Sequence, residues 1–175
     1  YDWAVAQPVM PVYASDYIRK VLDFRTLAVA RDGDAWVVRG NGDLRTVRWS
    51  GPGVPRLAEA RDGAGYTAGP GGSYIHLTSG SARFALDNDG PTLPYVRDAS
   101  GRLSNWRRSA DGRSLSVDVA GYTRPFIRFA NATRCRATVD GRDVAASHGA
   151  DWRIELGAGN PARLTPQHVE LTCDR

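Results

Sequence analysis

Several aromatic side chains of this sequence are flanked by arginine and asparagine, a combination that suits the binding of sugars. Sugar rings present apolar C–H faces, so an exposed indole or phenol ring beside hydrogen-bond donors can hold a polysaccharide. The alternative is that each ring anchors the core, and we expect this for Trp36 and Trp152. For the other rings both interpretations stay open. The predicted carbohydrate-binding residues are Trp49, Tyr66, Trp106, Arg48 and Arg107.

The three histidines, His76, His148 and His168, follow none of the common catalytic or metal-binding spacings. Neither Gly-x-Ser-x-Gly nor His-x-x-Glu-His occurs. An arrangement of Ser147, His168 and an aspartate can be drawn, but no spacing in the sequence supports it. We interpret each imidazole either as exposed to solvent or as buried in the core with its hydrogen bonds formed. The chain is therefore predicted to contain no catalytic residue and not to be an enzyme.

Most carboxylates are aspartates in turns, where the side chain caps the turn to which it belongs. The run Asp87-Asn-Asp-Gly90 places two carboxylates on one tight loop, and hard oxygen ligands are what Ca²⁺ requires. The EF-hand spacing is absent, and an ordinary turn explains the same residues. Asp87 and Asp89 are thus a calcium candidate only, and no cofactor is predicted.

The two cysteines, Cys135 and Cys173, lack the CxxC or Cys/His neighbourhood of a metal site. In a cytosolic protein they would be unpaired core residues, whereas in an exported protein they would pair. We favour a disulfide between them. In the loop-entropy model this bond would stabilise the fold by roughly 4 kcal/mol.

Composition excludes several classes of protein. Apolar residues make up 42% of the 175 residues, which is too many for a disordered chain, and no apolar run approaches the ~20 residues of a membrane span. The net charge is +4, and Lys20 is the single lysine among the basic residues, which are otherwise arginines. The arginines are spread along the chain and interleaved with aspartate, so nucleic-acid binding is not predicted.

The pattern of apolar residues predicts one helix, at residues 15–24, after an extended segment from Pro8. Ser15 is its expected cap, and Tyr17, Ile18, Val21 and Leu22 form one apolar stripe. From Thr26 onward the period changes to two, which is typical of strands. Asp-Gly between apolar runs predicts a hairpin around residues 31–34.

Further strands are predicted across the rest of the chain, among them residues 135–139 and 167–173, with one long interruption. Residues 50–72 are rich in glycine and proline, and we expect an irregular binding loop there. Short hairpins are expected at residues 79–80, 111–112 and 140–142. The fold class is therefore all-β, a β-sandwich of jelly-roll type, with a closed barrel as the second choice. Residues 1–25 are expected to be a linker or remnant of a preceding domain, and residues 26–175 the sandwich.

The first of these segments, Pro8-Val-Met-Pro-Val-Tyr-Ala-Ser-Asp-Tyr-Ile18, resembles the last strand and helix of a polysaccharide-deacetylase (β/α) domain. The pattern that follows resembles the C-terminal region of the large Pel-type exopolysaccharide deacetylases of bacteria. That likeness rests on Arg-Gly-Asn-Gly-Asp-Leu-Arg-Thr-Val-Arg-Trp49, Gly-Ser-Tyr-Ile-His-Leu77, Leu-Ser-Asn-Trp-Arg-Arg108 and Arg-Phe-Ala-Asn-Ala-Thr-Arg-Cys135. These motifs together cover most of the chain.

The resemblance implies a C-terminal piece of a larger periplasmic or secreted bacterial protein that acts on an amino-sugar polymer of the biofilm matrix. The Asp/His/His metal motifs of such deacetylases do not occur here, so no catalytic residue is carried over. The expected partners are the polysaccharide and an upstream catalytic domain of the same polypeptide. The alternative is a docking domain that binds no sugar. Trp49, Tyr66 and Trp106 in an open groove would favour sugar binding, whereas their burial beside a separate apolar patch would favour docking.

Overall fold

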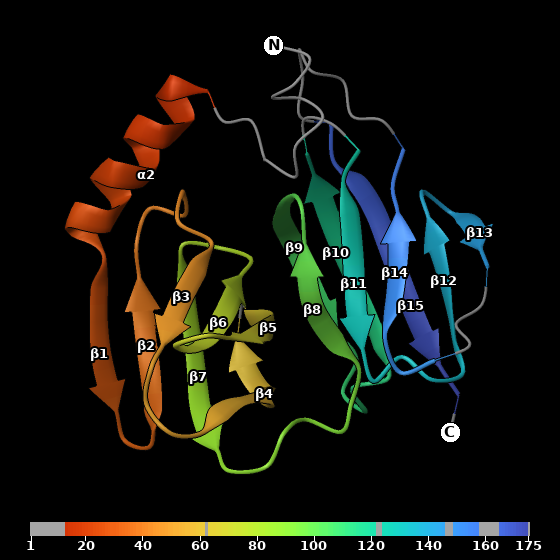
Figure 1. Cartoon of the computed structure of the whole chain (residues 1–175), viewed down its shortest axis with the longest axis horizontal. Coiled ribbons are helices and arrows are strands. Elements are labelled where there is room, and N and C mark those ends of the chain that lie inside the picture. The colour runs from red at the N-terminus through yellow and green to blue at the C-terminus, as the bar shows by residue number, and fades with distance from the viewer. Residues whose placement is uncertain (1–12, 62, 122–123, 146–148, 158–164, 175) are drawn as a thin grey trace.

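The computed structural model describes residues 13–61, 63–121, 124–145, 149–157 and 165–174. Over these residues the chain forms one helix and fifteen strands (Figure 1). The elements are α2 (Ala14–Thr26), β1 (Ala28–Asp32), β2 (Ala35–Arg39), β3 (Thr46–Trp49), β4 (Val54–Arg61), β5 (Gly63–Gly69), β6 (Gly72–Leu77), β7 (Ser81–Asp87), β8 (Tyr95–Ala99), β9 (Arg102–Arg108), β10 (Ser114–Ala120), β11 (Phe126–Ala130), β12 (Cys135–Val139), β13 (Arg142–Val144), β14 (Trp152–Glu155) and β15 (Gln167–Cys173). The predicted all-β class with a short N-terminal helix is confirmed.

The strands form three sheets, which we name A, B and C. Sheet A has the order β1-β2-β7-β4, sheet B the order β14-β11-β8-β5-β6-β3, and sheet C the order β13-β12-β15-β10-β9. Nearly all neighbouring strands are antiparallel; β5 and β8 form a parallel pair. Along β6 and β10 buried residues alternate with half-buried ones, which indicates that one face of each sheet covers a core.

Two hydrophobic cores lie side by side and share sheet B. In the first, sheet A packs on β5 and β6 through Val38, Leu57, Phe84, Ile75 and Leu77. In the second, sheet C packs on β8, β11 and β14 through a larger set of aliphatic and aromatic side chains. That set includes Val96, Val117, Phe129, Ile154 and Val169.

The parallel pairing of β5 with β8 joins the two cores. Its register places Gly65 beside Val96. A Cβ atom on Gly65 would lie 1.8 Å from the carbonyl oxygen of Val96, so only glycine permits this approach of the two backbones. Ala64 contributes to the second core and Tyr66 to the first, so β5 belongs to both.

Several predicted turns and pairings are confirmed. The strands β1 and β2 form the expected hairpin, in which Gly33 takes a φ of 63° between Asp32 and Ala35. The turns at residues 111–112 and 140–142 join β9 to β10 and β12 to β13 as antiparallel neighbours. Cys135 and Cys173 are directly opposite each other on β12 and β15 and form the predicted disulfide.

Three expectations were wrong. Residues 50–72 are not a long loop, because most of them form β4 and β5. Gly71, with a φ of 101°, lies in the turn between β5 and β6, whereas Gly65 permits the close approach of two backbones. Residues 79–80 do not close a hairpin, since β6 belongs to sheet B and β7 to sheet A. The helix begins at Ala14, with Tyr13 as its N-cap and no side-chain cap, so Ser15 is not the cap.

Within the described residues, we find no helix long and apolar enough to cross a membrane.

Candidate docking site

The helix α2 turns its apolar side away from the rest of the molecule. At about 100° per residue, its five large apolar side chains fall within roughly half of the helix circumference, and Tyr13 precedes them at the N-cap. All six are between 41% and 71% exposed: Tyr13, Tyr17, Ile18, Val21, Leu22 and Phe24. Val29 on the adjoining strand β1 is exposed as well. We call these seven residues the α2 apolar face.

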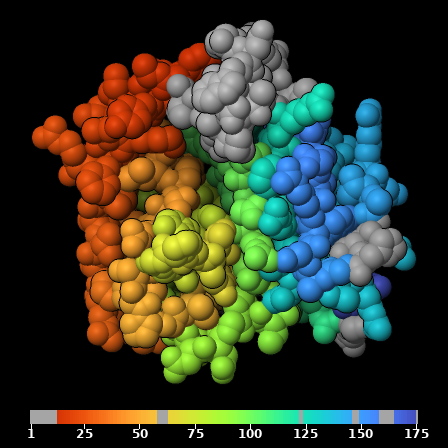
Figure 2. Space-filling view, in the orientation of Figure 1, coloured from red at the N-terminus to blue at the C-terminus, as the bar shows by residue number. Residues whose placement is uncertain are grey.

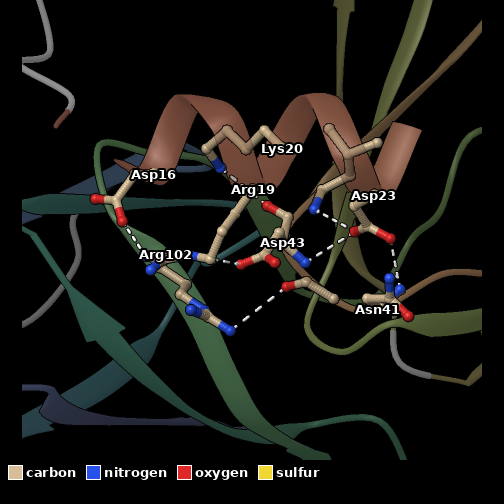
Figure 3. A network of polar contacts seen from close by, with 9 residues as sticks. Asp16, Arg19, Lys20, Asp23, Asn41, Asp43 and Arg102 are labelled. Carbon is tan, nitrogen blue, oxygen red and sulfur yellow. Dashed lines mark hydrogen bonds and ion pairs between the residues drawn. The ribbon is translucent and has the colours of Figure 1, made fainter. Parts of the chain in front are cut away.

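The opposite side of α2 is polar, and it is the side that contacts the sandwich (Figure 3). Asp23 is the buried residue of this helix, at 1% exposure. Its carboxylate accepts hydrogen bonds from three backbone N–H groups of the turn that follows β2: Asn41 (2.5 Å), Asp43 (2.9 Å) and Leu44 (2.9 Å). We call residues 41–44 the anchor turn. Asp23 thus holds α2 against this turn by accepting backbone N–H hydrogen bonds, as a capping side chain does at the N-terminus of a helix.

Basic side chains of α2 reach the same turn. The ammonium group of Lys20 donates to the backbone oxygen of Asp43 at 2.9 Å, and Arg19 Nε lies 3.6 Å from its carboxylate. From the other half of the molecule, Arg102 on β9 donates through Nη2 to the backbone oxygen of Gly42 at 3.4 Å. Figure 3 shows Arg102 beneath the helix, with Asp16 directed toward it. The anchor turn therefore links α2 to both halves of the sandwich.

The ionisation of Asp23 favours this arrangement. Burial alone would raise the pKa of its carboxyl group, but the N–H groups of Leu44, Asn41, Asp43 and Gly42 outweigh burial, so the pKa is lowered. The carboxylate is therefore charged at neutral pH, where a charged acceptor forms stronger hydrogen bonds than a neutral one.

Two of the predicted carbohydrate-binding rings belong to the first core. Tyr66 lies on β5, only 8% exposed, and stacks parallel on Tyr95 with 5.2 Å between ring centroids. Burial there raises the pKa of Tyr95 to about 12. Trp49 ends β3 and is partly buried, with 5.3 Å between the centroids of its ring and that of Trp36. Its Nε1 donates a hydrogen bond to the backbone oxygen of Pro52 at 3.0 Å. Both rings therefore have structural roles.

The remaining predicted residues are distributed over two sheets. Trp106 on β9 packs partly against the second core, and the guanidinium of Arg108 lies 5.7 Å from its ring centroid. Arg107 lines an open hollow of about 370 Å³ on sheet C. Arg48 is exposed on β3 and donates to the backbone oxygen of Gly71 at 3.0 Å. Because Tyr66 lies in the core, the five predicted residues do not form one open groove.

The calcium candidate has other partners. Asp87 ends β7, accepts a hydrogen bond from the backbone N–H of Asn88 and pairs with Arg56 at 3.3 Å. The backbone N–H groups of Asn88 and Asp89, followed by Arg56, lower the pKa of Asp87. Asp89 follows in the turn and lines a hollow that also contains Asp87 and Arg56. Among the described residues, no group of three or more acidic, cysteine or histidine side chains is placed to hold a metal ion.

Two of the three histidines lie in the described part of the chain. His76 is largely buried, and burial lowers its pKa; its Nε2 lies 2.7 Å from the backbone oxygen of Arg97. On sheet C, His168 Nδ1 lies 2.6 Å from a carboxylate oxygen of Asp118, whose hydrogen bond raises the pKa of the imidazole. The third histidine, His148, and its neighbour Ser147 lie outside the described residues.

The spacing of apolar residues predicted the apolar stripe of α2 but not its outward direction, and the role of Asp23 was not predicted. A signal for Asp23 was present, because it is an acidic residue on the side of the helix opposite the stripe, ahead of an Asn-Gly-Asp segment that favours a turn. Comparison with known proteins adds no relative: no family model, curated protein or solved structure matches the chain.

Proposed function

We propose that this chain is a non-catalytic docking domain, in which α2 packs permanently on a folded domain of the same polypeptide. The observation that carries the proposal is the orientation of α2, with its charged side on the sandwich and its apolar side in solvent. The rings that would favour sugar binding in an open groove include the buried Tyr66, and the separate apolar patch that would favour docking is present.

The α2 apolar face is large enough for an interface. With roughly 150–250 Å² per aromatic side chain, its three aromatic rings alone leave on the order of 400 Å² accessible to solvent. The four aliphatic side chains bring the total toward the ~800 Å² per partner of a standard interface. Isolated patches of this size are uncommon on monomers and mark interaction sites.

The charges around the face favour a protein partner over a membrane surface. Between residues 13 and 34 the four acidic residues (Asp16, Asp23, Asp32, Asp34) balance the four basic ones (Arg19, Lys20, Arg25, Arg31). Helices that lie on membranes carry a surplus of basic residues to attract anionic lipids. A neutral face also provides no electrostatic steering for a diffusing partner, whereas a covalently joined domain is present at high effective concentration.

The resemblance to Pel-type deacetylases supplies the identity of that domain in this proposal. The partner would be the upstream catalytic (β/α) barrel, and the whole polypeptide would be exported to the periplasm or secreted. The Cys135–Cys173 disulfide supports export. The exopolysaccharide would then be engaged by the catalytic domain, while the present chain contributes structure and position.

Site-specific photo-crosslinking in the native full-length polypeptide tests the proposal. With p-benzoylphenylalanine in place of Tyr17, mass spectrometry should identify one crosslinked peptide from a domain outside residues 1–175. Replacing Leu22 and Phe24 together with serine should lower its yield at least about tenfold, since each is a large contact residue. The matched control is Arg136→Ser, at an exposed position on sheet C, which should leave the yield unchanged.

Both serine substitutions fall on exposed side chains, so the melting temperature should stay within a degree or two of wild type. Crosslinks to lipid alone, crosslinks to a second copy of residues 13–174, or an absence of crosslinks would each contradict the proposal.

A further inference from the structure

The strand β1 continues directly from α2, and no other strand in the described part of the chain pairs with its outer side. It is the terminal strand of sheet A, with β2 as its neighbour, and all five of its residues are exposed. One residue, Leu27, separates it from the helix. Figure 1 shows α2 and β1 following one another along the same outer edge, and in Figure 2 their atoms form one continuous surface at that edge. A domain that covers α2 therefore comes close to the free side of β1.

The register of the hairpin shows which backbone groups lie on that free side. Asp32 and Ala35 close the two-residue turn as a hydrogen-bonded pair, and the next pairs are Arg31 with Trp36 and Ala30 with Val37. Hydrogen-bonded and non-hydrogen-bonded pairs alternate along an antiparallel ladder. The N–H and C=O groups of Val29 and Arg31 consequently point away from β2, toward the space beside the sheet.

The other sheet edges carry features that discourage strand addition. The strand β4 contains Pro55 and an irregular register, β9 pairs with β10 through a bulge, and β13 is only three residues long. Each remaining edge also presents exposed or half-buried charged side chains, which oppose pairing with another chain. These are Arg48 on β3, Arg56 on β4, Arg107 on β9, Arg142 on β13 and Arg153 on β14.

By contrast, β1 begins with the uncharged residues Ala28, Val29 and Ala30, and its register is regular over all five positions. Its charged residues, Arg31 and Asp32, are next to the hairpin turn. The small side chains of the first three residues leave room for a neighbouring strand, and uncharged side chains impose no like-charge repulsion on it.

We infer that the domain packed on α2 also contributes an uncharged, apolar β-strand that pairs with the free side of β1 and extends sheet A to five strands. The inference rests on the proposed docking function and specifies its geometry. Backbone hydrogen bonds to Val29 and Arg31 would fix the direction and register of the added strand, while the α2 apolar face covers its neighbouring surface. Docking through the helix alone would leave these two residues bonded to water.

Amide hydrogen exchange in the full-length polypeptide, read at single-residue resolution, distinguishes the two arrangements. The docked wild type is compared with the Leu22→Ser/Phe24→Ser variant, in which docking is lost. We expect the amides of Val29 and Arg31 to exchange at least about tenfold more slowly in wild type, because they are hydrogen-bonded only when the added strand is present. The amides of Ala28 and Ala30, which face β2, serve as internal controls and should change little.

A second variant tests the backbone hydrogen bonds to the added strand by removing one of their donors. Val29→Pro removes an N–H group on the free side without removing a bond to β2, and proline is tolerated on an edge strand. It should reduce the Tyr17 crosslink at least about threefold, whereas Val29→Thr, which keeps the N–H group, should not. Equal exchange rates for Val29 and Arg31 in both proteins, with a crosslink that still depends on Leu22 and Phe24, would overturn strand addition and leave docking intact. Loss of that dependence would instead contradict docking itself.

Discussion

Replacing Asp23 with alanine should detach α2 from the sandwich. The variant removes a buried carboxylate that accepts hydrogen bonds from the N–H groups of Asn41, Asp43 and Leu44. Hydrogen bonds to a charged group contribute about 1.5–3 kcal/mol each, but the anchor turn is only partly buried and water can replace some of them. We therefore expect a loss of about 3 kcal/mol in the free energy that holds α2 in place.

Limited trypsin digestion measures this loss at the helix itself. Arg19, Lys20 and Arg25 are cleavage sites on α2, and trypsin reaches them only when the helix opens. Since 1.4 kcal/mol corresponds to a factor of ten, cleavage at these sites should accelerate on the order of 100-fold in Asp23→Ala. The matched control is Asp32→Ala, which removes an exposed partner of Arg83 and should change the rate less than about fivefold. A change below threefold in Asp23→Ala would refute the anchoring role.

The same anchor should depend on pH in one direction. The pKa of Asp23 is lowered in the folded protein relative to its ordinary value of 3.8. Its contribution is therefore complete above that ordinary value and is lost as the pH falls through the lowered pKa. Under acid conditions the wild type and Asp23→Ala should converge in the exposure of α2, which circular dichroism and a stable acid protease can follow. Convergence at neutral pH would contradict the assignment.

Three further outcomes are expected. Gly65→Ala should lower the free energy of unfolding by about 3 kcal/mol in urea titrations, because the new methyl group meets a carbonyl oxygen of β8. Gly149→Ala should have little effect, because its methyl group would lie 4.0 Å from the carbonyl oxygen of Asp151, at ordinary van der Waals distance. In wild type, the contribution of His168 is complete below the ordinary imidazole pKa of 6.5 and is lost as the pH rises through the raised pKa. The urea midpoint of His168→Gln should therefore lie furthest below that of wild type at pH values under 6.5 and approach it as the pH rises. Denatured wild type without reductant should show no titratable thiol, and replacing Cys135 and Cys173 with serine should cost roughly 2–5 kcal/mol of stability. Two titratable thiols, an unshifted midpoint difference, or a stable Gly65→Ala variant would each contradict the corresponding argument.

The strands that sequence patterning predicted well are those in which alternation and turn chemistry agree. The predicted limits of β12 and β15 match the structure, and so does the hairpin around Gly33. The prediction of a loop at residues 50–72 was wrong because glycine and proline are typical of turns in general. Gly65 is needed for contact with a strand thirty positions away in sequence, and no local pattern carries that information.

The candidate site was only partly predictable, for a related reason. The spacing of Tyr17, Ile18, Val21 and Leu22 defines an apolar side of the helix but not the surface that will cover it. The direction is decided by Asp23 and the anchor turn, whose N–H groups lie beside the helix because the hairpin of β1 and β2 brings the chain back to it. Likewise, Tyr66 could be identified as an aromatic in a glycine-rich segment, but its stacking on Tyr95 depends on the fold as a whole.

Sheet B has a consequence for how the molecule folds. Because β5 supplies Ala64 to the second core, and Tyr95 of β8 packs against the first, neither half of the chain contains every residue of its own core. A chain cut between β7 and β8 would leave β5 without its parallel neighbour and the second core without Ala64, so each piece would present a new sheet edge to solvent. The two cores should therefore unfold in a single cooperative transition, and a nick in residues 88–94 should be tolerated only as long as the two fragments remain associated.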